Sequence, residues 1–308
     1  MIQVQELTKR YGDFEAIQGV SFSIGKGEIV GFLGPNGAGK TTTMRILSCF
    51  MPPTSGSGSI AGLDLFRNSL EVRKRIGYLP EHPPLYPEMT VRGYLFFVAT
   101  IKGISKREQK AKLSKAIEQC GLVEVQDRLI GRLSKGYRQR IGIAQALIHD
   151  PEVVILDEPT IGLDPAQIIE IRRLIKSLAG ERTILLSTHI LPEVSMLCNR
   201  VIVINRGKIL ASDAYEKLTS EMDRGQRLHL KARGLDVERL RSLPGIVDVQ
   251  SEDADSCLVE AEQGKEMREA VSRYVISQGW GLLELTSKSL TLEEVYLRLI
   301  SESEGYSA

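Results

Sequence analysis

A glycine-rich segment between a predicted buried strand (28–33) and a predicted helix (41–50) carries the clearest chemical pattern in the sequence. Its form is G-x-x-x-x-G-K-[ST], in which glycines let backbone N–H groups close around phosphate oxygens. The lysine reaches the terminal phosphates of a nucleotide, and the hydroxyl that follows can bind Mg²⁺. The pattern predicts a nucleotide phosphate site formed by Gly34, Pro35, Asn36, Gly37, Ala38, Gly39, Lys40, Thr41 and Thr42.

Two adjacent carboxylates follow a second apolar run. Asp157 and Glu158 come directly after 153–156, which is Val-Val-Ile-Leu. Alone, such a pair is most often an ordinary strand end, but a phosphate loop upstream makes it the metal side of the same site. We expect Asp157 to hold Mg²⁺ directly or through water, and Glu158 to polarise the attacking water as a general base.

The sequence around these two segments predicts an α/β fold with a parallel core sheet. Residues 2–33 contain short β-like runs with glycine-bearing turns. Residues 91–146 place apolar side chains at three-and-four spacing, which indicates helices. From 151 to 210, buried strands alternate with helices and end in a hairpin. Such alternation would bring the loops after the strands to one edge of the sheet.

The C-terminal part has a different character. Residues 220–308 carry a net charge of −6, whereas residues 1–219 carry +7. Their pattern reads strand, helix, two strands, helix and strand, followed by a last helix. This order resembles a split βαβ, ferredoxin-like module, and it contains no catalytic cluster.

A third motif distinguishes this chain from other proteins with a phosphate loop. Residues 133–139 read LSKGYRQ, between the phosphate loop and the two carboxylates. Together with those motifs, it makes the segment 11–189 resemble the nucleotide-binding subunit of an ATP-binding cassette (ABC) transporter. The common form of this family signature is LSGGQ, so Lys135 and Tyr137 are departures. From the residues alone, the same motif could be only a helix N-cap.

The resemblance assigns roles to further residues. Ser134 and Gly136 keep the hydroxyl and the small unit of the signature, which in this family caps the γ-phosphate of ATP held by the other subunit of a dimer. Tyr11 matches the aromatic residue that stacks on adenine. Asp164 matches the loop that links the two ATP sites, and His189 matches the switch histidine near the γ-phosphate and the attacking water.

Glu81 is the more serious departure from the family pattern. It ends the run GYLPE (77–81), where the family usually has glutamine. A glutamate can still accept a hydrogen bond from metal-bound water, but it adds negative charge near Mg²⁺ and phosphate. The GYLPE form is frequent among ATPase subunits of ABC-2-type exporters. The ending LTLEEVYL (290–297) resembles the closing helix of drug-export, nitrous-oxide-reductase-maturation and gliding-motility ATPase subunits.

The resemblance implies an architecture and a mode of action. Residues 1–219 would form the ABC cassette, with a parallel core sheet, an antiparallel β subdomain and a helical subdomain at about 88–150, and residues 220–308 would form an accessory α+β domain. The cofactors would be ATP and Mg²⁺. The chain would power a separate ABC-2-type membrane permease, for export, through ATP-driven dimerisation with a second copy or a homologous ATPase subunit.

One alternative is a soluble ABC ATPase that acts in translation or DNA maintenance. Translation-type members carry two cassettes, whereas this chain has one phosphate loop and one signature. DNA-maintenance members insert long coiled coils or zinc modules between Lys40 and Asp157, and here that interval is short. A small-molecule phosphotransferase would share the phosphate loop but would not need the signature, Asp164 and His189 together.

Composition excludes several other classes of protein. The 308 residues are 42% hydrophobic and 26% charged, which argues against a disordered or collagen-like chain. The net charge of +1 does not predict nucleic-acid binding. No apolar run approaches a membrane span, and the N-terminus lacks a signal pattern, so we expect a cytoplasmic chain held at the inner membrane face by its permease. The widely spaced cysteines indicate neither a zinc site nor a disulfide framework: Cys49, Cys120, Cys198 and Cys257.

Overall fold

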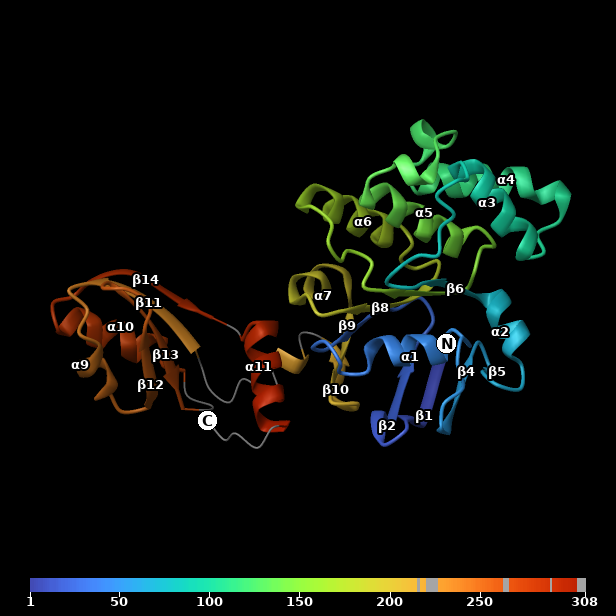
Figure 1. Cartoon of the computed structure of the whole chain (residues 1–308). Helices are drawn as coiled ribbons and strands as arrows, with labels where there is room; N and C mark the ends of the chain where they lie inside the picture. The colour runs from blue at the N-terminus through green and yellow to red at the C-terminus, as the bar shows by residue number, and fades with distance from the viewer. Residues whose placement is uncertain (215–216, 220–226, 263–265, 289, 304–308) are drawn as a thin grey trace. The chain divides into compact units, whose positions relative to one another are not determined.

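The chain separates into two units (Figure 1). Each unit buries its own hydrophobic side chains. The first comprises Met1–Tyr215 together with Leu299–Ala308, and the second comprises Glu216–Arg298. The computed structural model describes residues 1–214, 217–219, 227–262, 266–288 and 290–303. Within these ranges, none of the helices is long and apolar enough to cross a membrane.

A six-stranded sheet forms the centre of the first unit. Five of its strands are parallel, and β10 is antiparallel at one edge. Every residue of β3 and β7 is buried, as expected for parallel strands that are covered on both faces. Along the sheet, the order is β10 (Lys208–Ala214), β9 (Arg200–Asn205), β3 (Ile29–Leu33), β8 (Thr183–Thr188), β7 (Val153–Asp157) and β6 (Ile76–Leu79).

The register of these strands aligns their carboxyl ends. Leu33 of β3 pairs with Thr188 of β8, and Ser187 of β8 pairs with Asp157 of β7. The loops that follow β3, β7 and β8 therefore leave the sheet side by side. This edge is where open α/β sheets bind ligands.

An antiparallel sheet forms a separate layer of the first unit (Figure 1). In the turn between β1 and β2, Tyr11 pairs with Phe14, so two aromatic residues lie at one tip of this sheet. The order is β2 (Phe14–Ile24), β1 (Ile2–Tyr11), β4 (Ser55–Ile60) and β5 (Leu63–Asp64).

Helices cover the central sheet and form the predicted helical segment. Several begin at capping residues: Thr90 before α3, Ser134 before α5 and Asp164 before α6 each accept a hydrogen bond from a backbone N–H of the first turn. In Figure 1, α3, α4 and α5 (green) lie together. The helices are α1 (Lys40–Leu47), α2 (Ser69–Arg75), α3 (Val91–Ile101), α4 (Lys106–Gln119), α5 (Lys135–Leu147), α6 (Pro165–Ser177) and α7 (Leu191–Leu197), with 3₁₀ turns at Val123–Val125 and Ile130–Arg132.

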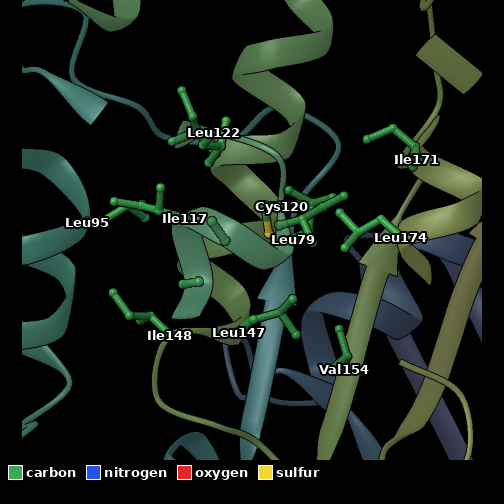
Figure 2. Close-up of a cluster of buried hydrophobic side chains, with 14 of the residues drawn as sticks. Leu79, Leu95, Ile117, Cys120, Leu122, Leu147, Ile148, Val154, Ile171 and Leu174 are labelled. Carbon is green, nitrogen blue, oxygen red and sulfur yellow. The ribbon is translucent and has the colours of Figure 1, made fainter. Parts of the chain in front are cut away.

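One core joins the helical segment to the sheet. Figure 2 shows side chains from strands and helices converging: Leu79 of β6, Val154 of β7, Ile117 of α4, Leu147 of α5 and Leu174 of α6. Burial of each such aliphatic side chain stabilises the fold by about 1.5–3 kcal/mol. This core packs the end of α5 against β6 and β7.

The second unit is an antiparallel sheet with helices packed against its buried face. Its strand order is β12-β13-β11-β14, and the chain order of its elements agrees with the sequence pattern. The elements are β11 (Arg227–Arg233), α9 (Val237–Arg241), β12 (Ile246–Ser251), β13 (Ser256–Ala261), α10 (Arg268–Ser277) and β14 (Gly281–Ser287). The last helix, α11 (Leu292–Ser303), spans the boundary between the two units.

Candidate nucleotide site

The glycine-rich loop passes directly from β3 into α1. Gly39 precedes the helix with φ of 104°, and a side chain there would approach the Ala16 carbonyl oxygen to 2.6 Å, so only glycine fits. Lys40 Nζ donates to the carbonyl oxygens of Gly34 at 2.8 Å and Pro35 at 3.2 Å. The loop therefore curls around a buried ammonium group at the positive end of α1, which is an arrangement suited to anions.

A cavity of 420 Å³ lies over this loop. Most of the residues predicted from the sequence line it: Tyr11, Asn36, Gly37, Gly39, Lys40, Thr41, Thr42, Glu81 and Glu158. Sequence reasoning missed Phe14, Ala16 and Ile161, which also line it. Phe14 could have been found, because it is the second aromatic residue of the turn that contains Tyr11. Gly34, Pro35 and Ala38 shape the loop without lining the cavity.

Asp157 lies behind the loop and is fully buried. Its Oδ1 accepts hydrogen bonds from Ser187 Oγ at 2.5 Å and Thr41 Oγ1 at 3.3 Å, whereas its buried Oδ2 has no partner among the described residues. Burial raises the pKa of this carboxyl above its usual range. A buried carboxylate with a spare oxygen beside a threonine hydroxyl fits a small divalent cation that also binds phosphate.

The same edge has few other metal-binding groups. Among the described residues, no group of three or more His, Cys, Asp or Glu side chains is arranged to hold a metal ion. Mg²⁺ typically uses one or two protein oxygens and completes its shell with water and substrate phosphates. The donors near Asp157 match that mode better than an all-protein cage.

Glu158 is held between two basic groups. Its Oε1 lies 3.3 Å from Lys40 Nζ, and its Oε2 lies 3.0 Å from His189 Nδ1. Its backbone has φ of 49°, a left-handed conformation that is uncommon for glutamate, and its N–H donates to the Ser187 carbonyl oxygen at 3.1 Å. A strained residue held this firmly in a cavity wall indicates a functional position.

Tyr11 forms the outer wall of the cavity and is 45% exposed. Its hydroxyl donates to Met51 Sδ at 3.1 Å, and Lys9 Nζ lies 5.4 Å from the ring centroid. Phe14, which is 65% exposed, lies beside it in the same turn. An exposed aromatic face at the mouth of a phosphate site is suited to stacking against a base.

The signature residues do not line this cavity. Ser134 caps α5, with its Oγ accepting from Tyr137 N at 3.4 Å, as the N-cap interpretation requires. Gly136 packs against Gln167, whose Oε1 would lie 2.5 Å from a side-chain carbon at that position. The start of α5 therefore contacts the start of α6 in its own chain.

Asp164 likewise lies outside the cavity lining and acts as an N-cap. It accepts a hydrogen bond from Gln167 N at 2.9 Å at the start of α6. Lys135 extends to the same loop, where its Nζ would be 2.3 Å from a side-chain carbon at Gly162. The structure thus gathers the predicted residues into two groups, one around Lys40 and one around the starts of α5 and α6.

Comparisons with known proteins agree with this geometry. A family model described as "ABC transporter" matches residues 17–161. The chain is 37% identical to the bacitracin transport ATP-binding protein BcrA of Bacillus licheniformis, over 97% of each chain. It is 31% identical to the linearmycin resistance ATP-binding protein LnrL of Bacillus subtilis, over 97% of this chain and 98% of that one.

Solved structures match the first part of the chain. An ATP-binding subunit of an ABC transporter is 30% identical, with a TM-score of 0.65 over 72% of this chain and 92% of that one. A dimeric cassette in a post-hydrolysis state, bound to ADP and phosphate, is 25% identical, with a TM-score of 0.63 over 70% and 98%. The chain therefore belongs to the ATP-binding proteins of ABC transporters, the subunits that bind and hydrolyse ATP.

Proposed function

We propose that this ATPase powers export through a separate ABC-2-type membrane permease. The main support for ATP hydrolysis is the position of Glu158, which lies between Lys40 and His189 in the wall of the cavity. The relatives support the direction, since their names include bacitracin transport, linearmycin resistance and Nod factor export. The alternative role in translation or DNA maintenance has no comparable support.

In the proposed reaction, Lys40 neutralises phosphate charge and Glu158 accepts the proton of the attacking water. His189 keeps Glu158 oriented through its 3.0 Å contact. It would also face the terminal phosphate of a bound ATP. Thr41 and Asp157 are the residues that would hold Mg²⁺, which supplies charge neutralisation for the phosphates, and Glu81 would face the Mg²⁺ ion only through one of its bound waters. Tyr11 would stack on adenine.

We further propose that the cavity is completed by a second subunit, either another copy or a homologous ATPase. Ser134 and Gly136 lie at a helix start but outside the cavity of their own chain. We therefore propose that the Ser134 hydroxyl and the N-terminus of α5 cap the γ-phosphate held by a partner. Asp164 would lie between the two nucleotides. ADP lacks the γ-phosphate, so hydrolysis would loosen the dimer and drive the opening step.

A second cleft of 440 Å³ is the proposed docking surface for the permease. Arg45, Arg73 and Lys102 line it, and none of its described lining residues is acidic. Beside it, Tyr86 contacts Tyr94 and Phe97 edge-on, with ring centroids 6.0 and 5.7 Å apart. Cationic and exposed aromatic groups suit a helix with apolar and acidic side chains. Docking there would hold the chain at the cytoplasmic membrane face.

The two units suggest how the sequence divides into domains. We propose an ABC cassette at 1–219 with a helical subdomain at about 88–150, and an accessory domain at 220–308. The β-α-β-β-α-β order and antiparallel sheet of the second unit support a ferredoxin-like fold for that domain.

Glu158→Gln tests the assignment of the base, because it keeps the side-chain shape and removes the proton acceptor. We expect the variant to bind ATP, to lose hydrolysis and to accumulate as a dimer with ATP but not with ADP. Steady-state ATPase assays and light scattering measure both effects. A matched change at an exposed carboxylate outside the cavity, Glu152→Gln, should alter neither. Undiminished hydrolysis by Glu158→Gln would refute the assignment.

A further inference from the structure

A buried carboxylate outside the nucleotide cavity joins the loops that follow β7 and β8. Glu193, in the first turn of α7, has no exposed surface. Its Oε1 accepts a hydrogen bond from Thr160 Oγ1, and its Oε2 accepts one from Thr188 Oγ1 at 2.8 Å. Arg172 Nη2 lies 3.9 Å from Oε1. Burial of a carboxylate is unfavourable unless hydrogen bonds and a cation compensate for lost water, so each of these contacts matters.

Each threonine is close in sequence to a catalytic group. Thr160 lies two residues after Glu158 and two before Gly162, and Thr188 directly precedes His189. The two loops already meet at the cavity, where His189 Nδ1 lies 3.0 Å from Glu158 Oε2. Glu193 provides a second connection between them, behind the cavity wall.

The carboxylate of Glu193 fixes which groups donate the hydrogen bonds in this connection. A carboxylate only accepts hydrogen bonds, so both threonine hydroxyls must donate to it. Thr188 Oγ1 in turn accepts from Ile190 N at 3.0 Å, which fixes the backbone around His189. If one loop moved without the other, Glu193 would lose a hydrogen bond in an apolar interior. A concerted movement of both loops keeps both hydrogen bonds.

We propose that Glu193 is a positioning residue that makes the loop from Glu158 to Asp164 follow His189. A movement of His189 caused by the γ-phosphate would then also move Asp164, which would change the second nucleotide site. This inference rests on the proposed function, in which His189 faces the γ-phosphate and Asp164 lies between two sites. It adds a residue that contacts neither nucleotide nor partner but sets how strongly ATP drives dimerisation.

The test uses the full chain in the Glu158→Gln background, where ATP should produce a dimer. Adding Glu193→Gln keeps the side-chain volume but replaces one acceptor oxygen with a donor. We expect the ATP concentration at half-dimerisation, measured by analytical ultracentrifugation, to rise about tenfold. Binding of ADP to the monomer should stay unchanged, since ADP has no γ-phosphate. If Glu193 had only a structural role, Glu193→Gln would instead lower the melting temperature and weaken ATP-driven dimerisation and ADP binding together.

Thr160→Val keeps the evidence for linkage separate from folding effects, because it removes only one hydroxyl. It should reproduce the dimer defect, and the Thr160→Val/Glu193→Gln double variant should be no worse than Glu193→Gln alone. Glu152→Gln, which loses an exposed ion pair with Arg75, is the control. An unchanged dimerisation midpoint in both Thr160→Val and Glu193→Gln would overturn the proposal.

If the proposed function itself were wrong, the experiments would give a different result. In that case Glu158→Gln alone would not dimerise with ATP. The role of Glu193 would then be decided in the otherwise unaltered chain, where kcat should fall about tenfold in Glu193→Gln at an unchanged KM for ATP. An unchanged kcat there would overturn the role of Glu193 as well.

Discussion

The phosphate loop and the signature segment differ in how far one chain completes them. Around the phosphate loop, Lys40, Thr41 and Glu158 line a single cavity and are linked to Asp157 and His189 by contacts within 3.3 Å. At the start of α5, Ser134 caps its own helix and contributes nothing to that cavity. Folding of one chain therefore completes the cavity around the phosphate loop (the phosphate half of this comparison), whereas it leaves the start of α5 (the signature half) outside that cavity.

The reason lies in topology. Parallel strands end at a common edge, so the loops after β3, β7 and β8 meet whenever the sheet forms. The signature begins a helix of the helical segment. The hydrophobic core in Figure 2 holds the end of that helix against the sheet, and its start contacts Gln167 of α6. Packing places it beside α6, away from the cavity of its own chain. The comparison predicts that damage to the two halves will have different consequences.

The largest effect is expected for Lys40→Ala. It removes the charge at the centre of the loop and leaves buried Glu158 without its partner at 3.3 Å. Loss of one preorganised electrostatic group lowers catalytic rates about 100- to 1,000-fold, and we expect at least this loss of ATPase activity. ATP and ADP binding should both weaken, which equilibrium titration with each nucleotide measures. Lys26→Ala, at an exposed turn, is the control, and activity retained in Lys40→Ala would contradict the role of the loop.

The signature half should respond differently to disruption. Ser134→Arg places a bulky cation at the helix start, so it should block ATP-driven dimerisation of Glu158→Gln. ADP binding by the monomer should stay normal, because the phosphate loop is untouched. Light scattering and ADP titration separate these effects. Ser105→Arg, at the start of α4 in the same helical segment, is the matched control. Equal loss of ADP binding in Ser134→Arg would show that the two halves are not separable.

Sequence patterns were sufficient where a motif has an obligatory backbone context. The glycines of the phosphate loop, the all-apolar strand before Asp157 and the alternation of strands and helices predicted the α/β cassette and most of the cavity lining. The family resemblance supplied Tyr11 and His189, which as single residues carry no such pattern.

Other features depend on register and packing, which single-residue patterns do not contain. Ser187 hydrogen-bonds Asp157 because β7 and β8 align at that position. Glu193 is buried between two threonines although glutamate is usually exposed, and no spacing rule marks it. The sequence patterns assign no role to its partners, Thr160 and Thr188. The second unit shows the same limit, since its element order was predictable but its role was not.

A pH effect should reveal how firmly the end of the signature helix is attached to the sheet. His149 follows α5, and its Nε2 lies 2.8 Å from the Ile76 carbonyl oxygen at the start of β6, to which it donates when neutral. Burial lowers the pKa of His149 from 6.5 to about 4. Between these values the unfolded chain binds more protons than the folded one, so stability falls as pH falls through this window.

Between pH about 6.5 and about 4, His149 is expected to lower the free energy of unfolding by up to about 3 kcal/mol. Below that range it should cause no further loss. Urea unfolding at several pH values measures it. His149→Gln keeps a hydrogen-bond donor but does not titrate, so its stability should depend less on pH in this window. An identical pH slope in the variant and the parent would show that His149 is not the group responsible.

The smallest effect is expected at Glu81, where the phosphate half departs from its family. Glu81 lines the cavity, and its side chain is 36% exposed, so water screens its charge. If its carboxylate faces Mg²⁺ and phosphate as an added negative charge, Glu81→Gln should tighten Mg·ATP binding by less than about 1.5 kcal/mol. ADP without Mg²⁺ should show a smaller change, and Glu88→Gln, on the same loop but outside the cavity lining, should show none. Weaker Mg·ATP binding in Glu81→Gln would mean that the carboxylate is needed to hold metal-bound water. The phosphate half would then depend on an acidic residue that the common glutamine cannot replace.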